Sequence, residues 1–329
     1  MSAQKVFVTG ASGLLGSNMC HRLSSDGYDV VGLVRNNSNL TALNGFGGSL
    51  VRGDLSDENW LARQMEGVDF VFHSAGLVTF DNRRREELYR VNVDGTRNVA
   101  RAAIAARVKR LIHVSSVAAV GIPAAGELAD ESIVYNKFKY HIAYADSKHF
   151  GEVEIEKAVS KGLDAVIINP ATIIGRGDVY FHSGVLLKIF LGKRIVPYVA
   201  GGMCVVGVYD VVDAGVSAMT LGRKGERYII GGENLTFREF FGQVAGVLGA
   251  GGIAIRVPRL AARTAAALSE IISSITLSPP LLTSAHVVSS TLPHYYSFEK
   301  AKRELGFTPH PVETSIRQSF EWYRENNLI

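Results

Sequence analysis

The chain has 329 residues, 47% of them hydrophobic and 20% charged, which is an ordinary globular composition and more than one typical domain needs. The net charge of +4 is scattered, and Arg83-Arg84-Arg85 runs directly into Glu86-Glu87. We interpret that run as a solvated helix start and expect no nucleic-acid partner. Cys20 and Cys204 lack the spacing of a disulfide framework or a metal site, so we expect reduced thiols in a cytoplasmic protein and no metal.

The first element predicted along the chain is a short apolar strand at residues 6–9. The glycine-rich segment Thr9–Gly16 and a helix-like run at residues 17–25 follow it directly. In this order Gly10 permits a tight turn, Gly13 lets the backbone approach a pyrophosphate, and Gly16 lets helix and strand pack closely. The free N–H groups at the start of the helix favour phosphate. An ordinary tight turn is the alternative, but the strand–glycine–helix order predicts dinucleotide binding.

Strand and helix patterns alternate through the first half of the chain, which predicts an α/β fold with a doubly wound parallel (Rossmann) sheet. Strand candidates lie at residues 6–9, 29–34, 50–53, 70–73, 111–115 and 166–169. Two further strands, at 205–209 and 227–230, are expected to return to this body. We therefore assign residues 1–175 and 205–231 to a cofactor-binding domain. Residues 176–204 and 232–329 are then a smaller, discontinuous substrate lobe.

The pair Tyr144 and Lys148 carries the chemistry, because residues four apart lie on one face of a helix. A nearby cation favours phenolate and lowers the pKa of a tyrosine, which makes Tyr144 a candidate general acid/base. Tyr135 and Lys139 have the same spacing. Their stretch has no helical apolar periodicity, so we interpret Tyr135 as a loop tyrosine.

No apolar run reaches the length of a membrane span without a charge. The longest candidate, residues 260–277, contains Arg263 and Glu270 and fits a packed or surface helix better. We expect no stable membrane insertion.

Together these motifs resemble the extended branch of the short-chain dehydrogenase/reductase superfamily, of the NAD-dependent epimerase/dehydratase type, over nearly the whole chain. The family's motifs occur in order, as residues 9–16 (TGASGLLG), 53–55 (GDL), 73–76 (HSAG), 91–96 (VNVDGT), 111–116 (LIHVSS), 144–152 (YADSKHFGE) and 169–175 (NPATIIG). The resemblance implies that Ser116, Tyr144 and Lys148 are catalytic. It places the cofactor against Gly10, Ser12, Gly13, Leu14, Leu15, Arg35, Asp54, Leu55, Ala75, Gly76, Asn92, Tyr144, Lys148, Pro170, Thr172 and Ile173.

The resemblance also implies the roles in a hydride transfer. Tyr144 gives or takes the proton of the substrate oxygen, while Lys148 lowers the pKa of Tyr144 and holds the nicotinamide ribose. Ser116 donates a hydrogen bond to the same oxygen. We choose Ser116 over Ser115 because strand alternation sends the two side chains to opposite faces. Asn92 either supports the proton relay or serves as a helix-bend residue.

Arg35 bears on the choice of cofactor. NAD-preferring members of such folds usually carry an acid at the end of the second strand, whereas this sequence has Arg35 there and no acid beside it. A guanidinium matches the 2′-phosphate of NADP in charge and geometry. We expect NADP, with NAD as the alternative because an arginine can also stack on adenine.

The reaction type is the most open point. Val117-Ala118-Ala119 follows Ser116 where dehydratases carry Asp-Glu, which argues against dehydration. Residues 178–187 are largely apolar, where nucleotide-sugar epimerases hold a diphosphate. The chain looks most like the dihydroflavonol-reductase-like group, so we expect reduction of an apolar or aromatic small molecule. A nucleotide-sugar epimerase is the alternative, and a non-enzymatic cofactor-sensing regulator is a third. A homodimer through helices near residues 87–107 and 144–160 is compatible with the sequence.

Overall fold

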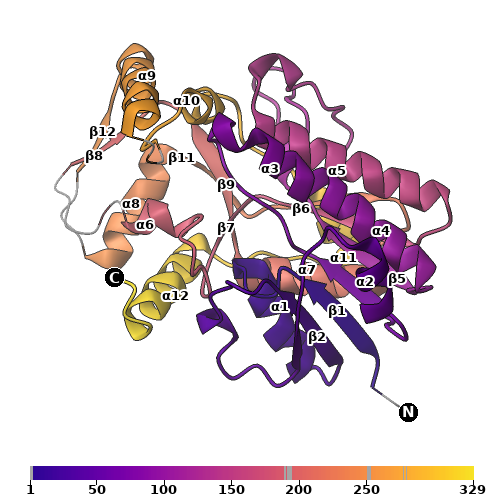
Figure 1. Cartoon of the computed structure of the whole chain (residues 1–329). Coiled ribbons are helices and arrows are strands. Elements are labelled where there is room, and N and C mark those ends of the chain that lie inside the picture. Colours follow the sequence, from indigo (N-terminus) through magenta and orange to yellow (C-terminus); the bar gives the residue numbers. More distant parts are fainter. Residues whose placement is uncertain (1–2, 189, 191–194, 250–252, 277, 279) are drawn as a thin grey trace.

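A computed structural model describes residues 3–188, 190, 195–249, 253–276, 278 and 280–329. Its main sheet has seven parallel strands in the order β10-β6-β5-β4-β1-β2-β3 (Figure 1). The strands are β1 (Lys5–Thr9), β2 (Asp29–Val34), β3 (Ser49–Arg52), β4 (Phe70–His73), β5 (Arg110–Val114), β6 (Ala165–Pro170) and β10 (Arg227–Ile230). The strand order reverses between β1 and β4, which defines a doubly wound fold. The predicted α/β class is confirmed.

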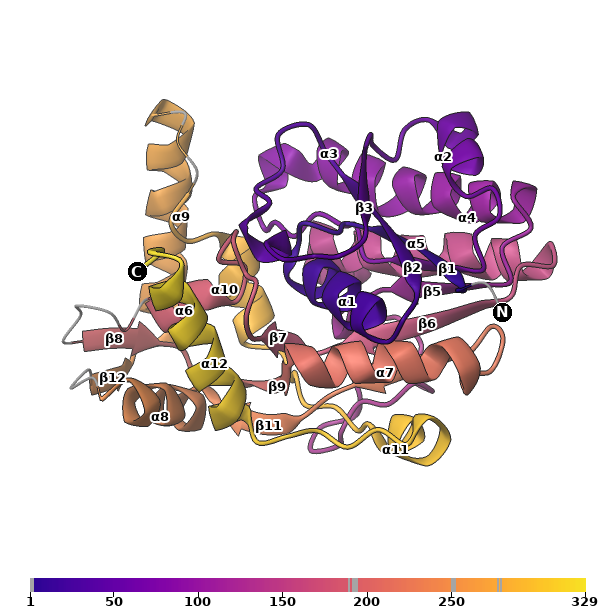
Figure 2. The same cartoon turned by 90° about the horizontal axis from the view of Figure 1, so that it is seen from below.

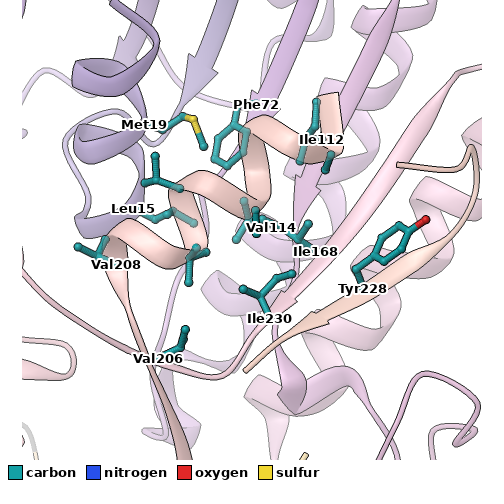
Figure 3. Packing of buried hydrophobic residues seen from close by; sticks show 14 of the residues in the cluster. Leu15, Met19, Phe72, Ile112, Val114, Ile168, Val206, Val208, Tyr228 and Ile230 are labelled. Carbon is teal, nitrogen blue, oxygen red and sulfur yellow. The ribbon is translucent and has the colours of Figure 1, made fainter. Parts of the chain in front are cut away.

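Helices cover both faces of this sheet (Figure 2). One face carries α1 (Leu14–Ser25), α7 (Val208–Thr220) and α11 (Glu299–Leu305), and the other carries α2 (Glu58–Gln64), α4 (Gly95–Ala105) and α5 (Ala143–Ser160). Figure 3 shows how α1 and α7 pack on the sheet through Leu15, Met19, Val208 and the ring of Phe72. Because both faces are covered, the strands are nearly continuous apolar runs, as the sequence pattern indicated.

A smaller part of the molecule lies beside the carboxyl ends of the main strands. It has a three-stranded sheet in the order β11-β9-β7 and a two-stranded sheet of β12 and β8. These strands are β7 (Thr172–Ile174), β8 (Ile195–Tyr198), β9 (Gly202–Gly207), β11 (Glu233–Thr236) and β12 (Ile253–Arg256). The helices here are α6 (Gly184–Lys188), α8 (Phe237–Leu248), α9 (Arg259–Thr276), α10 (Ser284–Ser290) and α12 (Val312–Glu325).

Short helical segments complete the chain. Four are 3-10 turns: η1 (Thr41–Leu43), η2 (Asn82–Arg84), η4 (Val117–Ala119) and η5 (Phe138–Tyr140). Between α3 (Arg85–Tyr89) and α4 the backbone forms one π-helical segment, η3 (Arg90–Asp94). The basic run at residues 83–85 is a helix start, as predicted, and Arg83 and Arg84 form ion pairs with Asp81 and Glu87.

One strand prediction is wrong. Residues 205–209 were expected to form a strand of the main sheet, but β9 ends at Gly207 and pairs with β7 and β11. Val208 already belongs to α7, where Val208, Val211 and Val212 are buried at helical spacing. A run of valines is compatible with either a strand or a helix. The strand ends at Gly207, whose extended backbone (φ −71°, ψ 144°) is the N-cap of the helix.

Candidate active site

The predicted site residues follow the carboxyl ends of four neighbouring strands. The register pairs Thr9 with His73, His73 with His113, and Val114 with Ile168, so β1, β4, β5 and β6 end at the same edge. In an open parallel sheet, ligands bind at this edge, near the reversal of strand order. The structure thus brings together segments that are up to 160 residues apart in the sequence.

The glycine-rich turn joins β1 to α1 and presents an open helix N-terminus. Gly10 has φ +71°, and a Cβ on it would lie 2.6 Å from the backbone nitrogen of Ala75. A Cβ on Gly16 would collide with the carbonyl group of Gly10, whereas one on Gly13 would stay 3.3 Å from that oxygen. No side chain caps α1 at Gly13, so the first N–H groups of the helix are free to bind an anion.

The remaining predicted cofactor contacts surround this turn. Ser12 and Leu15 are buried, and Leu14 is half-buried on the first turn of α1. Gly76 is exposed and Ala75 half-buried just after β4, where the backbone nitrogen of Ala75 donates to Thr9 Oγ1 at 3.2 Å. Beyond β6, Pro170 is buried while Thr172 and Ile173 keep partial exposure. A surface of small, partly exposed residues at an uncapped helix suits an extended dinucleotide.

His73 fixes the centre of this edge. Its Nδ1 lies 2.7 Å from Thr9 Oγ1 and its Nε2 lies 3.1 Å from Thr96 Oγ1. Burial, with the charge of Lys148 as a smaller cause, lowers the pKa of His73 to about 3. His73 is therefore a neutral structural link between β1, β4 and α4, a role that its position in the sequence does not reveal.

Asn92 lies in the π-helical segment η3. Its Nδ2 donates to the carbonyl of Leu77 and to Ser147 Oγ, each at 2.9 Å, and its Oδ1 accepts from the nitrogen of Leu77 at 2.8 Å. Ser147 in turn donates to the carbonyl of Tyr144 at 2.8 Å. Single π-helical turns are typical of functional sites. The position of Asn92 in a π-helical segment agrees with the helix-bend alternative, and its part in a proton relay stays a prediction.

The predicted catalytic residues come together near the start of α5. Lys148 is buried and its Nζ donates to the carbonyl of Val114 at 2.9 Å. Ser116 lies two residues after β5 and is the N-cap of η4, where its Oγ accepts from the nitrogen of Ala118 at 3.1 Å. Tyr144 is half-buried on the first turn of α5. Of the two serines, only Ser116 affects the pKa of Tyr144, which its hydroxyl lowers in part.

The electrostatics of this group differ from the expectation in one respect. Burial raises the pKa of Tyr144, and the hydrogen bond with Ser116 lowers it in part. The predicted lowering by Lys148 is not among the causes, because its ammonium is bonded to the Val114 carbonyl. Burial lowers the pKa of Lys148 itself to about 8, against the opposing charge of Glu152.

Tyr135, with the same spacing to a lysine as Tyr144, lies in a loop as predicted. Its hydroxyl donates to Asp146 Oδ1 at 2.6 Å, and its ring stacks on His149 at 4.3 Å between centroids. Burial, and then the carboxylate of Asp146, raise the pKa of Tyr135. The exposed Lys139 lies instead over the ring of Tyr140. Tyr135 and Lys139 therefore do not form a second Tyr/Lys pair.

Arg35 follows β2, the strand that pairs with β1, and its side chain is exposed. A second guanidinium lies there: Nη1 of Arg52, the last residue of β3, donates to the carbonyls of Arg35 at 3.3 Å and Asn36 at 3.1 Å. Sequence reasoning missed Arg52, because only the register of the sheet places it opposite Val34, next to Arg35. Glu87 is also near Arg35, but Arg84 is its ion-pair partner and the main cause of the lowered pKa of its carboxyl.

Asp54 and Leu55 follow β3. The carboxylate of Asp54 accepts from the nitrogen of Ser56 at 2.7 Å and from its Oγ at 2.5 Å, which lowers the pKa of Asp54. Leu55 packs against Gly95, where a Cβ would lie 2.8 Å from Leu55 Cδ1. These contacts hold the turn after β3 in place.

The ring of Tyr144 is bordered by residues that the sequence did not predict. The ring centroid of Phe80 lies 5.8 Å from that of Tyr144 and 4.2 Å from that of His286 on α10. Phe80 belongs to an apolar cluster with Ala118, Ile122, Val288 and Leu292. Phe80 and His286 are 206 positions apart, so no local pattern could have paired them.

Two buried charged side chains lie behind this segment: Glu152, the last residue of the motif at 144–152, and Lys137, which sequence reasoning missed. Glu152 Oε1 accepts from Asn169 Nδ2 at 2.5 Å, and its Oε2 lies 3.4 Å from Arg227. Lys137 is almost fully buried, and its Nζ donates to the carbonyls of Val117 at 3.4 Å and Ala118 at 3.2 Å, just beyond Ser116. Burial lowers the pKa of Lys137 to about 7. These groups link α5, β6 and η4 through buried polar contacts.

Comparisons with known proteins agree with this geometry. The model of the NAD dependent epimerase/dehydratase family matches residues 6–231. A protein of Synechocystis sp. named "Putative dihydroflavonol 4-reductase" is 32% identical over 98% of this chain and 95% of its own length. Sterol demethylase protein B of Methylococcus capsulatus is 29% identical over 98% of this chain and 99% of its own. The crystal structure of gox2253 superposes with a TM-score of 0.85 at 31% identity, covering 98% of both chains.

Proposed function

Because the chain belongs to the NAD-dependent epimerase/dehydratase family of extended short-chain dehydrogenases/reductases, we propose that it is an NADPH-dependent oxidoreductase of apolar or aromatic ketones or aldehydes. The observation that carries this proposal is the surface facing Tyr144. Phe80 lies beside the tyrosine ring, and Val117 and Ala118 follow Ser116. This surface suits a carbonyl compound with an apolar body and offers no carboxylate for dehydration.

The residues support a proton transfer coupled to hydride transfer. When bound, the nicotinamide supplies the hydride to the carbonyl carbon or accepts it from the alcohol. Tyr144 delivers its phenolic proton to the substrate oxygen during reduction and takes it back during oxidation. Ser116, whose hydroxyl lowers the pKa of Tyr144 in part, stabilises the charge that develops on that oxygen. Lys148 would leave the Val114 carbonyl to bind the ribose and, through its charge, favour the phenolate.

The cofactor residues are those that surround the glycine turn, and we propose NADP as the preferred form. Arg35 and Arg52 together place two guanidinium groups at the ends of β2 and β3, where the adenine ribose would lie. A 2′-phosphate is dianionic near neutral pH and binds guanidinium groups in a fork geometry. Arg35→Asp should weaken NADPH binding more than about tenfold, since one charge-assisted contact contributes about 1.5–3 kcal/mol.

A fluorescence titration of NADPH and NADH against the wild-type protein, Arg35→Asp and Arg52→Gln measures this preference. We expect both variants to lose affinity for NADPH with little change for NADH. A matched control is Arg107→Asp, an exposed arginine beyond the far end of α4. Equal affinity of the wild-type protein for the two cofactors would rule out the preference for NADP.

The substrate class is tested with a panel of bulky ketones and aldehydes against UDP- and dTDP-hexoses. NADPH consumption reports reduction, and the epimer ratio of the sugars reports epimerisation. We expect turnover of apolar or aromatic carbonyl compounds that is lost in Tyr144→Phe. Epimerisation of a sugar nucleotide without carbonyl reduction would support the alternative enzyme. Tight cofactor binding with no turnover in either arm would support a cofactor-sensing regulator.

A further inference from the structure

Helix α9 stands out at the edge of the substrate lobe and projects away from the body of the molecule (Figures 1 and 2). It turns small residues toward the protein: its buried members are Ala262, Ala266 and Ser273. Its large apolar residues are exposed instead, with Leu260 at 76% and Ile275 at 77% of their full accessible surface. This is the reverse of the usual amphipathic arrangement, in which the large apolar residues face the core.

We name the exposed apolar face the α9 stripe; it consists of Leu260, Leu268, Ile271, Ile272 and Ile275. With 3.6 residues per turn, these five lie on one side of the helix, opposite the three buried small residues. Of the nineteen exposed large hydrophobic residues in the described part of the chain, these five share one helix. Scattered exposed apolar residues need no explanation, but a continuous patch indicates a binding surface.

The charges beside the α9 stripe are positive. Arg256 ends β12, and Arg259 and Arg263 lie on the first turns of α9. None of the three forms an ion pair within the described residues. The only carboxylate of the helix, Glu270, accepts hydrogen bonds from the nitrogen of Ser284 at 2.8 Å and from its Oγ at 2.9 Å. By the same helical geometry Arg263 lies at the edge of the stripe, next to Leu260, whereas Arg259 lies nearer the side of the buried alanines and donates to the carbonyl of Thr291 at 3.4 Å. The arginines therefore flank the N-terminal end of the stripe.

We propose that the α9 stripe docks this protein on the surface of a lipid bilayer with anionic headgroups. Exposed aliphatic residues flanked by arginines are the pattern of helices that lie in the bilayer interface. The arginines at the N-terminal end of the stripe complement anionic lipids, and each basic residue near such a surface adds to the attraction. No helix of the described residues is long and apolar enough to cross a membrane, so the contact is peripheral.

A second copy of the chain fits the same surface less well. Pairing two α9 stripes would bring two sets of the same arginines to one interface, with Glu270 already bonded to Ser284. The position of α9 also suits a lipid surface. Arg83 donates to the carbonyl of Ser273 at 3.3 Å, three residues after Phe80, whose ring contacts both Tyr144 and His286. Docking through the stripe would thus place the bilayer close to the substrate side of Tyr144.

The test is flotation of the full chain with vesicles of phosphatidylcholine, alone or mixed with phosphatidylglycerol, without substrate or cofactor. We expect binding to the mixed vesicles that weakens with salt and is several-fold weaker without the anionic lipid. Leu268→Gln/Ile275→Gln should reduce the partition coefficient at least about tenfold, since it removes two large aliphatic side chains from the contact. Arg259→Glu/Arg263→Glu should remove the preference for phosphatidylglycerol.

The matched control is Leu128→Gln/Val134→Gln, which changes two exposed aliphatic residues outside α9 and should bind like the wild type. Light scattering without vesicles gives the mass in solution. Failure of the wild type to bind mixed vesicles, or equal binding by Leu268→Gln/Ile275→Gln, would overturn the proposal. So would a dimer that only this variant dissociates, since a second copy would then cover the stripe. None of these readouts depends on the proposed reductase activity.

Discussion

Tyr144 differs from phenylalanine by one oxygen, so Tyr144→Phe removes the proton donor and leaves the packing against Phe80 in place. We expect kcat to fall by about 10²–10⁴-fold, the usual size of general acid/base catalysis, with the Kd for NADPH within about twofold. Lys148→Met should damage both kcat and Kd, because we propose that the lysine also holds the ribose. Stopped-flow kinetics and cofactor titration separate the two effects, and Tyr135→Phe is the control. A Tyr144→Phe protein at wild-type rate would remove Tyr144 from the mechanism.

Lys137 makes the stability of the protein depend on pH. Its pKa is lowered to about 7 by burial, from 10.5 in an exposed lysine. Below about pH 7 both the folded and the unfolded chain hold the proton, so the cost of burying the ammonium is at its full size. Between about pH 7 and 10.5 only the unfolded chain holds it, and this cost falls to zero as the pH rises.

Replacing Lys137 by methionine should therefore stabilise the protein more at pH 6.5 than at pH 10, by roughly a few kcal/mol in the difference. Urea unfolding at both pH values measures this, with the exposed Lys139→Met as the control. The hydrogen bonds to Val117 and Ala118 are lost at either pH and cancel in the comparison. An identical effect of Lys137→Met at the two pH values would contradict the assignment.

At this scale the sequence predicted the residues that belong to motifs. Tyr144 and Lys148 could be placed on one helix because their spacing is local, and their catalytic role, like that of Ser116, stays a prediction. Phe80, His286, Lys137 and Arg52 could not be found in this way. Each acquires its neighbours from a segment distant in sequence, and their residue types are common on surfaces and in cores alike.

At the scale of elements, α5 packs tightly against the π-helical segment η3. A Cβ on Gly151 of α5 would lie 2.8 Å from the backbone carbonyl oxygen of Asn92, so Gly151→Ala must displace η3 or α5. We expect a loss of about 1–3 kcal/mol in the free energy of unfolding, with reduced kcat. Gly242→Ala is the matched control, because that helical glycine has no atom within 4 Å of its Cβ position and should gain about 0.5–1 kcal/mol. Chemical denaturation of both variants measures the free energy of unfolding. A Gly151→Ala variant as stable as the wild type would show that η3 or α5 can move without cost.

The main-sheet strands were predicted to within a residue or two, because fully covered parallel strands are short apolar runs between glycines and polar turns. The exception at residues 205–209 shows the limit of this signal. Valines continue without a break from β9 into α7, and only tertiary packing decides where the strand ends. The π-helical turn was missed for a related reason, since one extra residue in a helix leaves little trace in an apolar period.

At the scale of the whole molecule, Asp178 ties the lobe to the C-terminal helix. Its carboxylate accepts from the backbone nitrogens of His182, Ser183 and Gly184 at 2.9–3.1 Å and from the hydroxyl of Tyr323 on α12 at 3.2 Å. Asp178→Ala should lower the free energy of unfolding by about 2–4 kcal/mol, since it leaves several buried donors without a partner. Asp213→Ala, which breaks a surface ion pair with Arg22, should cost less than about 1 kcal/mol. Comparable losses in the two variants, measured by thermal unfolding, would refute this role.

The assignment of cofactor binding and substrate binding to different parts of the chain is a proposal. We propose that residues 1–175 and 205–231 bind the cofactor and that residues 176–204 and 232–329 bind the substrate. The sequence indicated a discontinuous lobe, because strand patterns return after an apolar insertion. It did not indicate that β7 and β9 pair with each other, since that sheet joins segments about 30 residues apart whose patterns are equally consistent with the main sheet. A homodimer through the helices near residues 87–107 and 144–160 is a second proposal, which the mass in solution tests.

The three glycines of the turn after β1 are required for different reasons, and a library of variants would reveal the difference. Gly10 and Gly16 are required by the chain's own backbone, whereas Gly13 borders the place where a pyrophosphate would lie. In a saturation screen, substitutions at Gly10 and Gly16 would vanish from the pool of correctly produced protein. Substitutions at Gly13 would survive there and disappear only when cofactor capture is selected. For each position of the turn, the abundance of folded protein would be compared with the amount captured on the cofactor. This comparison would therefore distinguish the glycines required for folding from the glycine required for cofactor binding.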